Sequence, residues 1–325
     1  MSPCLRGKVI VGLFHKVKTM TEIDRRTFIR QSIRTAVATS AVGCLPALDL
    51  LALPALAVDS PPLAVRKGKN IKQLVQETVA ALGGIEQFVR PGEVVVVKPN
   101  IGWDRTVELA ANTHPEVVTT LVELCLDAGA KQVRIFDRTC NDERRCYTQS
   151  GIRSAVEGLN ADRVSLEYMD RRAYKELAIK GGKAFDRWEF YMPVIEADRL
   201  INVPIAKHHS ISKLTLGMKN LMGVIGGNRG RLHHQIAESL ADIASVIHTD
   251  LTVIDATRIL VANGPQGGRT EDVRNTETLI ASPDMVAADA YATTLFGFKP
   301  EDVATVVAAA QRGLGVMDLK QVRMV

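Results

Sequence analysis

The segment from Lys207 to His234 holds the densest group of chemically active side chains in this 325-residue sequence. It contains five glycines and four of the seven histidines of the chain. Its candidate functional side chains are two histidine pairs, three lysines and an asparagine: His208-His209, His233-His234, Lys207, Lys213, Lys219 and Asn220. Such groups suit three kinds of chemistry, namely holding an anionic ligand, acid–base catalysis, and binding a metal through neutral imidazoles. The alternative is a solvated loop that carries these histidines by chance.

A glycine-rich run, Gly-Gly-Asn-Arg-Gly at 226–230, lies inside this segment. Its backbone N–H groups could cradle a phosphate or a carboxylate, which makes Gly226 and Gly227 candidate ligand-binding residues. The run matches neither of the common nucleotide-binding glycine motifs, so it favours a nucleotide only weakly. The sequence also lacks Gly-x-Ser-x-Gly and His-Glu-x-x-His, the signatures of α/β-hydrolases and zinc proteases.

Polar residues also follow the apolar runs that are expected to form strands. These are Lys98-Pro99-Asn100 after 94–97, Asp137-Arg138 after 133–136, Lys207-His208-His209 after 200–204, and Asp255 after 251–254. Each residue taken singly is an ordinary loop residue. Ligands of open parallel sheets bind beyond the carboxyl ends of the strands. Together, these positions predict a cleft lined by lysine, asparagine, aspartate and histidine.

The elements that must position these residues alternate along the chain. Hydrophobic periodicity predicts helices over 70–82, 115–128, 148–157, 236–247, 285–296 and 300–311, and strands over 94–97, 133–136, 164–169, 199–203, 251–254 and 278–281. Pro115 suits the first helical turn, with Thr113 or His114 as its cap. This alternation predicts an α/β fold in which helices flank a parallel or mixed sheet in three layers, Rossmann-like, as one body or as two lobes.

The N-terminal region is typical of a twin-arginine export signal. Arg25-Arg26 precede an apolar run over 36–57 that ends in Ala-Leu-Ala, a pattern that signal peptidases cleave. We expect cleavage after Ala57, translation from Met20, and a periplasmic protein without a transmembrane span. An uncleaved membrane anchor and a lipoprotein attached through Cys44 are the alternatives. The predicted organisation is a signal peptide at 1–57, a linker and first helix at 58–93, and an α/β domain at 94–325.

The leader accounts for the positive charge of the chain. Residues 1–57 hold 8 basic and 3 acidic residues, which leaves 33 of each in the rest. A balanced mature chain does not have the basic surface of a nucleic-acid-binding protein. Cys140 and Cys146 could pair in an oxidising compartment, whereas Cys125 falls in a helical pattern typical of a buried thiol. No Cys-x-x-Cys is present, so we expect no iron–sulfur cluster.

Several motifs resemble a known family. Val-Val-Lys-Pro-Asn, Thr-His-Pro-Glu-Val-Val, Ile-Asn-Val-Pro-Ile-Ala-Lys-His-His, Leu-Gly-Met-Lys-Asn-Leu-Met-Gly and Ala-Ala-Asp-Ala-Tyr-Ala together look like the domain of unknown function 362, over roughly residues 94–325. This family is often found behind a twin-arginine signal and has no settled activity. The resemblance therefore implies a fold and an export route but no reaction.

The region around Lys219 is similar, more faintly, to the N-terminal domain of nickel-pincer lactate racemases. That resemblance implies that Lys219 tethers the cofactor, that His209 acts in acid–base catalysis, and that His234 binds the metal. The chain departs from the racemases at Leu216-Gly217-Met218-Lys219, where they have Gly-Gly-x-Lys, and at Asp137-Arg138, where they have a second catalytic histidine. The cofactor implied is a nickel pincer or another divalent metal.

The leading hypothesis is an exported enzyme that binds a small molecule at the strand ends. Its candidate residues fall into three groups: catalytic, Lys219, His209 and Asp137; ligand-binding, Lys98, Asn100, Lys207, Asn220, Gly226 and Gly227; metal-binding, His234 and His209. The rival hypothesis is a non-catalytic periplasmic binding protein for a small anion. A structural or interaction protein is the third hypothesis. The expected partners are a small-molecule ligand and the export machinery.

Overall fold

The computed structural model describes residues 60–325. In it, the run of valines forms strand β2 (Val94–Pro99). Val95, Val96 and Val97 are fully buried. Val95 and Val97 belong to one hydrophobic cluster and Val96 belongs to another. Successive side chains of a strand point to opposite faces, so this strand lies between two covering layers. The three-layer α/β prediction is confirmed.

The main sheet is mixed and has ten strands. Along the sheet their order is β12-β1-β11-β10-β7-β2-β3-β4, and β8 joins β10 and β9. The further bounds are β1 Pro62–Lys67, β3 Gln132–Ile135, β4 Val164–Leu166, β7 Arg199–Val203, β8 Ile205–His209, β9 Lys213–Thr215, β10 Leu251–Leu260, β11 Val273–Ser282 and β12 Arg323–Met324. The run from β10 to β4 is parallel, whereas β11 is antiparallel to both β10 and β1.

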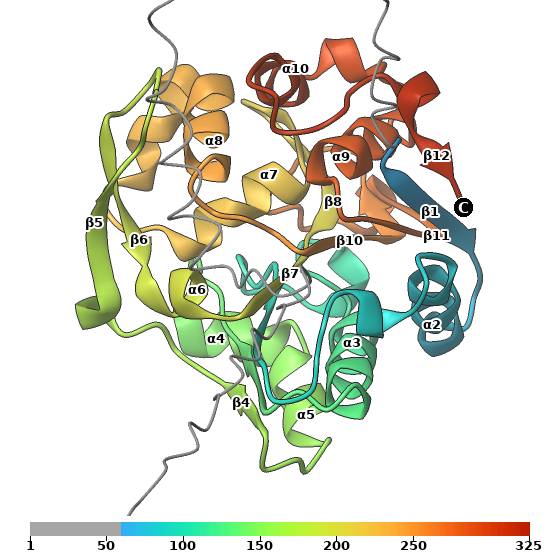
Figure 1. Ribbon diagram of the computed structural model, residues 1–325. Coiled ribbons are helices and arrows are strands. Elements are labelled where there is room, and N and C mark those ends of the chain that lie inside the picture. Colours follow the sequence, from blue (N-terminus) through green and yellow to red (C-terminus); the bar gives the residue numbers. More distant parts are fainter. Residues whose placement is uncertain (1–59) are drawn as a thin grey trace, which may run out of the picture. The chain divides into compact units, whose positions relative to one another are not determined.

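Helices cover both faces of this sheet (Figure 1). One cluster contains residues of α2 (Ile71–Ala81), α3 (Pro115–Asp127), α4 (Glu143–Gln149) and α5 (Ile152–Glu157). The other contains residues of α6 (Met192–Glu196), α7 (Gly217–Asn220), α8 (Ile236–Ala244), α9 (Met285–Thr294) and α10 (Ala304–Gln311). The described residues 60–325 belong to a single compact unit, so the two-lobe alternative is not found among them.

Short 3-10 helices connect these elements. Their bounds are η1 Ile85–Gln87, η2 Val107–Leu109, η3 Arg171–Ala173, η4 Leu221–Val224, η5 Arg229–Gln235, η6 Thr270–Asp272, η7 Pro300–Asp302 and η8 Leu319–Gln321. The predicted cap of α3 is His114, whose Nδ1 accepts a hydrogen bond from the backbone N–H of Glu116. Local capping chemistry therefore sets where α3 begins.

The predicted signal peptide, its cleavage point after Ala57 and the alternative start at Met20 lie outside the described residues. Within residues 60–325, no helix is both long enough and apolar enough to cross a membrane.

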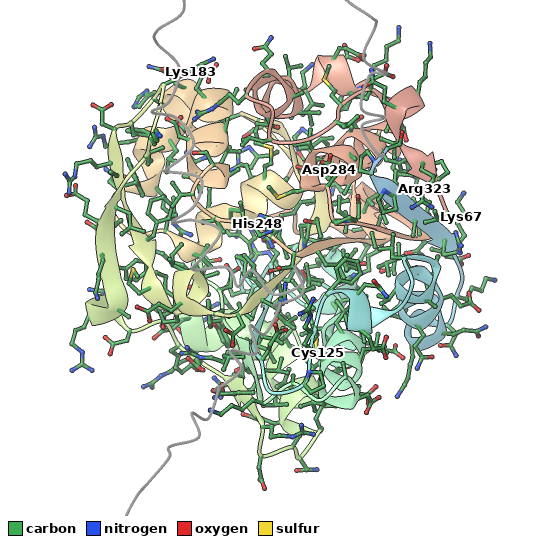
Figure 2. The ribbon with its side chains drawn as sticks, viewed as in Figure 1. Lys67, Cys125, Lys183, His248, Asp284 and Arg323 are labelled. Atoms are coloured by element: carbon green, nitrogen blue, oxygen red, sulfur yellow. The ribbon has the colours of Figure 1, made fainter. Side chains whose placement is uncertain are left out.

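The N-terminal boundary of the α/β domain differs from the prediction. The expected linker runs into β1, which pairs with β11 on one side and with β12 on the other. Lys67 and Arg323 accordingly lie near the same edge of the molecule in Figure 2. The domain thus includes residues well before 94, because a strand from the start of the described chain completes the edge of the sheet.

Two other predicted elements also differ. The helix expected over 148–157 is divided into α4 and α5 at Gly151, which has a left-handed φ of 72°. The region over 174–191 forms a separate hairpin of β5 (Tyr174–Ala178) and β6 (Arg187–Tyr191), which the sequence pattern did not predict. Asp242 on α8 anchors the tip of this hairpin by accepting hydrogen bonds from the backbone N–H groups of residues 183–185.

The cysteines give two clear results. Cys125 is fully buried on α3, as predicted, and burial raises the pKa of its thiol to about 12 (Figure 2). Cys140 and Cys146 are free thiols in this structure, the first exposed and the second buried. The disulfide considered from sequence is therefore not formed here.

Candidate functional site

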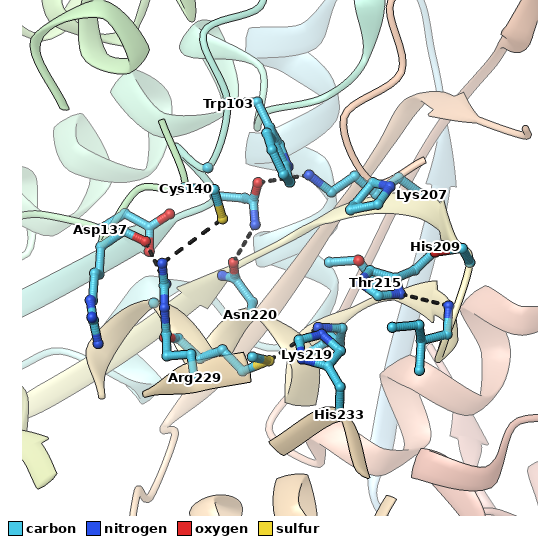
Figure 3. A pocket seen from close by; sticks show the side chains of 18 of the residues that line it. Trp103, Asp137, Cys140, Lys207, His209, Thr215, Lys219, Asn220, Arg229 and His233 are labelled. Atoms are coloured by element: carbon cyan, nitrogen blue, oxygen red, sulfur yellow. Dashed lines mark hydrogen bonds between the residues drawn. The ribbon is translucent and has the colours of Figure 1, made fainter. Parts of the chain in front are cut away.

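A cavity of about 390 Å³ lies beyond the carboxyl ends of the central strands (Figure 3). Six of the residues predicted from sequence line it: Asn100, Asp137, Lys207, His209, Lys219 and Asn220. They come from the residues after β2 and β3, from strand β8, and from the short helix α7. The strand-end rule thus brings together side chains that are more than 100 residues apart in the sequence.

A buried ion pair lies beneath this cavity. Lys98 Nζ donates to Asp137 Oδ1 at 2.8 Å and to the Pro99 carbonyl oxygen at 2.8 Å, while Asp137 Oδ2 accepts from the Ile101 N–H at 2.6 Å. The Lys98 side chain is 0% exposed. Burial lowers the pKa of Lys98, and the Asp137 carboxylate opposes that shift. Lys98 therefore supports Asp137 from below and does not line the cavity.

Gly223 is required by the same ion pair. A Cβ at this position would lie 1.7 Å from Asp137 Oδ1 and 2.6 Å from Lys98 Nζ. The backbone of Gly223 therefore approaches the pair more closely than any residue with a side chain could. Its carbonyl oxygen also accepts a hydrogen bond from the Arg138 N–H at 2.8 Å.

Asparagine side chains connect the strand ends to α7. Asn100 Nδ2 donates to Asn220 Oδ1 at 3.0 Å, and Asn220 Nδ2 donates to Asn202 Oδ1 at 2.8 Å. Asn202 Nδ2 in turn donates to the Gly217 carbonyl oxygen at 2.9 Å. Buried amides that satisfy one another in this way hold a single arrangement, because breaking one bond leaves a buried polar group unpaired.

Lys207 is fixed by the same network. Its Nζ donates to Asn100 Oδ1 at 3.0 Å and makes a short contact with the Ala111 carbonyl oxygen. The residue is 1% exposed, and burial lowers its pKa to about 7. Among residues 60–325 no carboxylate lies within ion-pair distance of it. Lys207 is thus a positioned amine that is about half protonated near pH 7 and has no ion-pair partner among the described residues.

Lys219 is held much more loosely. Its Nζ donates to the Met222 sulfur at 3.1 Å, a weak acceptor, and no carboxylate of the described chain forms an ion pair with it. Burial lowers its pKa to about 8. A lysine with this pKa is partly neutral slightly above pH 7, so its amine can take up and release protons.

The short helix that carries Lys219 is held at its first residues by a buried carboxyl group. Asp289 on α9 accepts hydrogen bonds from the N–H groups of Gly217 at 2.6 Å and Met218 at 3.0 Å, at the start of α7. Burial raises the pKa of Asp289 to about 7. A Cβ at Gly217 would lie 2.8 Å from Asp289 Oδ1, so the glycine permits this approach.

His209 faces the cavity as a neutral imidazole. Its Nδ1 accepts from the N–H groups of Ile211 at 3.1 Å and Ser212 at 3.2 Å, which leaves the ring proton on Nε2. Burial, followed by the charge of Lys219, lowers its pKa to about 3. His209 can therefore donate a hydrogen bond to a ligand but is a poor base near pH 7.

His233, and not His234, accompanies His209. The rings of His209 and His233 stack with their centroids 5.7 Å apart, and both residues line the cavity. His234 is exposed and is not part of the lining. Within residues 60–325, no three histidine, cysteine, aspartate or glutamate side chains gather as a metal site. The structure does not bring the predicted metal-binding pair, His234 and His209, together in the cavity.

The predicted glycine cradle is also occupied by the protein itself. The N–H of Gly226 donates to the Glu189 carbonyl oxygen at 2.8 Å, and that of Gly227 donates to Glu189 Oε2 at 3.1 Å. Neither glycine lines the cavity. Glu189 on strand β6 of the hairpin therefore accepts hydrogen bonds from the backbone N–H groups that the sequence suggested for anion binding.

Two arginines, Arg138 and Arg229, also line the cavity. Arg229 donates to the carbonyl oxygens of Arg138 at 2.8 Å and Thr139 at 2.7 Å, and Arg138 donates to those of Ile225 and Gly227. Both are bound to neutral acceptors, so their positive charges remain. With Lys207 and Lys219 they make the cavity strongly cationic.

Comparison with known proteins identifies the domain. Residues 95–294 match the profile of the family described as a domain of unknown function, DUF362. The chain belongs to the DUF362 family. It is also 28% identical over 241 residues to a thylakoid-associated protein of Synechocystis sp. strain PCC 6803, which covers 72% of each chain.

Two solved structures are similar to this DUF362 chain. One is a protein from Thermotoga maritima, with 14% identity and a TM-score of 0.40 over 71% of this chain and 60% of the other. The second is the lactate racemase apoprotein from Thermoanaerobacterium thermosaccharolyticum, with 10% identity and a TM-score of 0.46 over 71% of this chain and 56% of the other. The chain spans less than two thirds of each.

The DUF362 cavity contains residues that the sequence interpretation did not select. They are Gly102, Trp103, Cys140, Ser210, Ile211, Thr215, Met222, Gly223, Arg229, Gly230 and Pro265. Most lie in loops. Arg229 could have been found from its place in the glycine run, whereas Trp103 and Pro265 carry no pattern that marks them.

The buried ion pair of the DUF362 domain yields a stability prediction. Lys98→Met removes the counter-ion of a buried carboxylate, so we expect the free energy of unfolding to fall by about 3–5 kcal/mol in urea denaturation. Adding Asp137→Asn should restore part of the loss, since the amide oxygen can still accept from the Ile101 N–H. Lys72→Met, which breaks an exposed pair with Glu123, is the matched control and should change stability little. Similar small losses in Lys98→Met and Lys72→Met would contradict this role.

Proposed function

We propose that the DUF362 domain binds a small organic anion in the strand-end cavity and transfers a proton at it through Lys219. The observation that carries the proposal is the pair Lys207, which is buried, and Lys219, which is partly buried; both face one cavity without an ion-pair partner in the described chain. A buried charge is costly unless it is paired. A bound anion supplies the missing partner.

The two lysines suit different tasks. Lys207 is held by Asn100 and Ala111 and therefore suits a fixed anchor for the anionic group. Within the described chain Lys219 donates to the Met222 sulfur, a weak acceptor, and its pKa of about 8 lets its amine take up and release protons near neutral pH. His209 suits a hydrogen-bond donor through Nε2. This division supports an enzyme over a simple binding protein, because binding alone does not need a loosely held amine.

The nickel-pincer cofactor fits these residues only in part. Lys219 and His209 lie at the cavity, as a tethered cofactor would require, but His234 is exposed outside it. His233 lines the cavity instead. Because the assigned metal ligand is displaced, the proposed proton transfer is assigned to the amine of Lys219 itself and not to a metal. Intact mass and elemental analysis of protein made in its own cells test for added mass on Lys219.

Anion binding should depend on pH in a defined direction. Lys207 and Lys219 bind an anion best when protonated, so affinity is full below their pKa values of about 7 and 8 and weakens as pH rises through them. We expect the dissociation constant of acetate, measured by calorimetry, to increase by roughly tenfold or more between pH 6 and pH 9. Acetate itself stays ionised throughout this range.

Lysine variants test whether acetate binding depends on Lys207 and Lys219. Lys207→Met and Lys219→Met should each weaken acetate binding at pH 6.5 by roughly tenfold, as expected for the loss of a charged hydrogen-bond donor. Lys213→Met is the matched control, because Lys213 is exposed on neighbouring β9 and contacts the Phe298 ring without lining the cavity. Acetate binding that is absent, or equally strong at pH 6 and pH 9, contradicts the proposal.

A second experiment separates an enzyme from a binding protein. If Lys219 is a base, its amine takes the proton from the carbon beside the carboxylate of a bound acid, and a solvent deuteron replaces that proton in D₂O. We expect proton NMR of a panel of short carboxylic acids to show this exchange with the wild type. Lys219→Arg keeps the charge but removes the base, so it should bind acetate and slow exchange by roughly 10²-fold or more. Binding without exchange in the wild type favours the non-catalytic binding protein.

We also propose that the chain is exported by the twin-arginine route to the periplasm. Arg25-Arg26 and the apolar run to Ala57 support this, and the thylakoid association named for the Synechocystis relative is compatible with export. Changing both arginines to lysine should leave full-length precursor in the cytoplasmic fraction, whereas wild-type protein is recovered from the periplasm without its leader. Arg30→Lys serves as the control. Unchanged export of the double variant contradicts the route.

A further inference from the structure

The cavity has an apolar rim above its cationic floor. Trp103, Ile211 and Pro265 line the opening from three separate loops, and none of them is buried. Ile211 is 57% exposed, one of the three most exposed large hydrophobic side chains of the described chain. The floor residues Lys207 and Asn220 are only 1% and 2% exposed. The Lys207 amine therefore lies deeper in the cavity than the apolar side chains of Trp103, Ile211 and Pro265.

The rim is built from loops that the same strand anchors. The turn after β8 places Ile211 by bonding its N–H to the His209 imidazole. The loop carrying Pro265 is bound one residue earlier on β8, where the Gly264 N–H donates to His208 Nδ1 at 3.1 Å. A Cβ at Gly264 would lie 2.0 Å from the His208 carbonyl oxygen, so this loop packs directly on the strand. β8 thus fixes two parts of the rim relative to Lys207.

Trp103 is positioned from the opposite side. Its backbone N–H donates to Asn112 Oδ1 at 3.0 Å, and Asn112 Nδ2 donates back to the Trp103 carbonyl oxygen at 2.8 Å. The indole projects over the cavity near Lys207 and Cys140 in Figure 3. A planar apolar surface at the opening of the cavity is suited to stack on a ring or to cover a branched alkyl group.

We propose that the ligand is a monocarboxylate that carries an aromatic or branched apolar group, an inference that rests on the proposed anion-binding function. The carboxylate contacts Lys207 and Lys219, and the apolar group lies against Trp103 and Ile211. Phosphate sites commonly use a backbone N–H cradle, and the N–H groups of Gly226 and Gly227 are already bound to Glu189. About 390 Å³ is at the lower end for a ligand pocket, which suits one ring and one acid group.

Calorimetry with three probes tests this inference on the full mature protein at pH 6.5. Acetate supplies the charge alone, phenylacetate supplies the charge and a ring, and benzyl alcohol supplies the ring without the charge. We expect phenylacetate to bind at least roughly tenfold more tightly than acetate, as one buried apolar group commonly provides, and benzyl alcohol to bind more weakly than phenylacetate. Ile211→Ser should reduce the ratio of phenylacetate to acetate affinity by roughly threefold or more.

Met324→Ser is the control for the loss of an exposed apolar side chain, because Met324 is 52% exposed on β12 and does not line the cavity. It should leave the affinity ratio unchanged. Equal affinities for acetate and phenylacetate, or an Ile211→Ser ratio equal to that of the wild type, overturn the inference while anion binding stands. No binding of acetate or phenylacetate overturns anion binding itself and this inference with it.

Discussion

The ion pair between Lys98 and Asp137 is the constraint on which the strand-end site depends. It joins the ends of β2 and β3 below the cavity, and Asp137 Oδ2 also fixes the chain after β2 through the Ile101 N–H. The Tyr147 hydroxyl accepts from the Asp137 N–H, and Gly223 lies directly over the pair. Separating two buried charges is very unfavourable. Arrangements of β2, β3, α4 and η4 that break this contact are therefore strongly disfavoured.

The lysines above that pair show the opposite electrostatic condition. Lys98 has Asp137, whereas Lys207 and Lys219 have amide, carbonyl and sulfur acceptors within the described chain. The fold must hold these charges in place against their mutual repulsion. It does so through the asparagine network and through Asp289, which accepts from the start of α7. Holding like charges close together in fixed positions is typical of sites that are preorganised for a ligand of opposite charge.

Sequence patterns predicted the parts of the site that follow a general rule. Asn100, Asp137, Lys207 and His209 were found because the carboxyl ends of adjacent parallel strands meet at one edge. The assignment of Lys98 to the ligand was wrong in position, since it lies beneath the floor and binds Asp137.

Other features depend on contacts between distant segments, which no local pattern reveals. Glu189 takes the donors of Gly226 and Gly227 from a hairpin that was not predicted at all. The 3-10 helix η5 presents His233 to the cavity and leaves His234 exposed, and a spacing counted along the chain cannot distinguish these neighbours. The early strand β1 was missed because its partner β11 lies some 200 residues later.

The histidine-rich sequence suggests a site that changes charge through imidazole, but the structure assigns that property to lysine. His209 is held neutral because two backbone N–H groups occupy Nδ1 and burial beside Lys219 opposes a further charge. Lys207 and Lys219, by contrast, have pKa values of about 7 and 8. An arriving anion stabilises their protonated forms and raises both pKa values, so binding draws protons into the cavity. The same coupling lowers the fraction of Lys219 that is present as free amine when an anion lies beside it, so the reacting proton must lie close to that amine for transfer to compete with protonation from solvent.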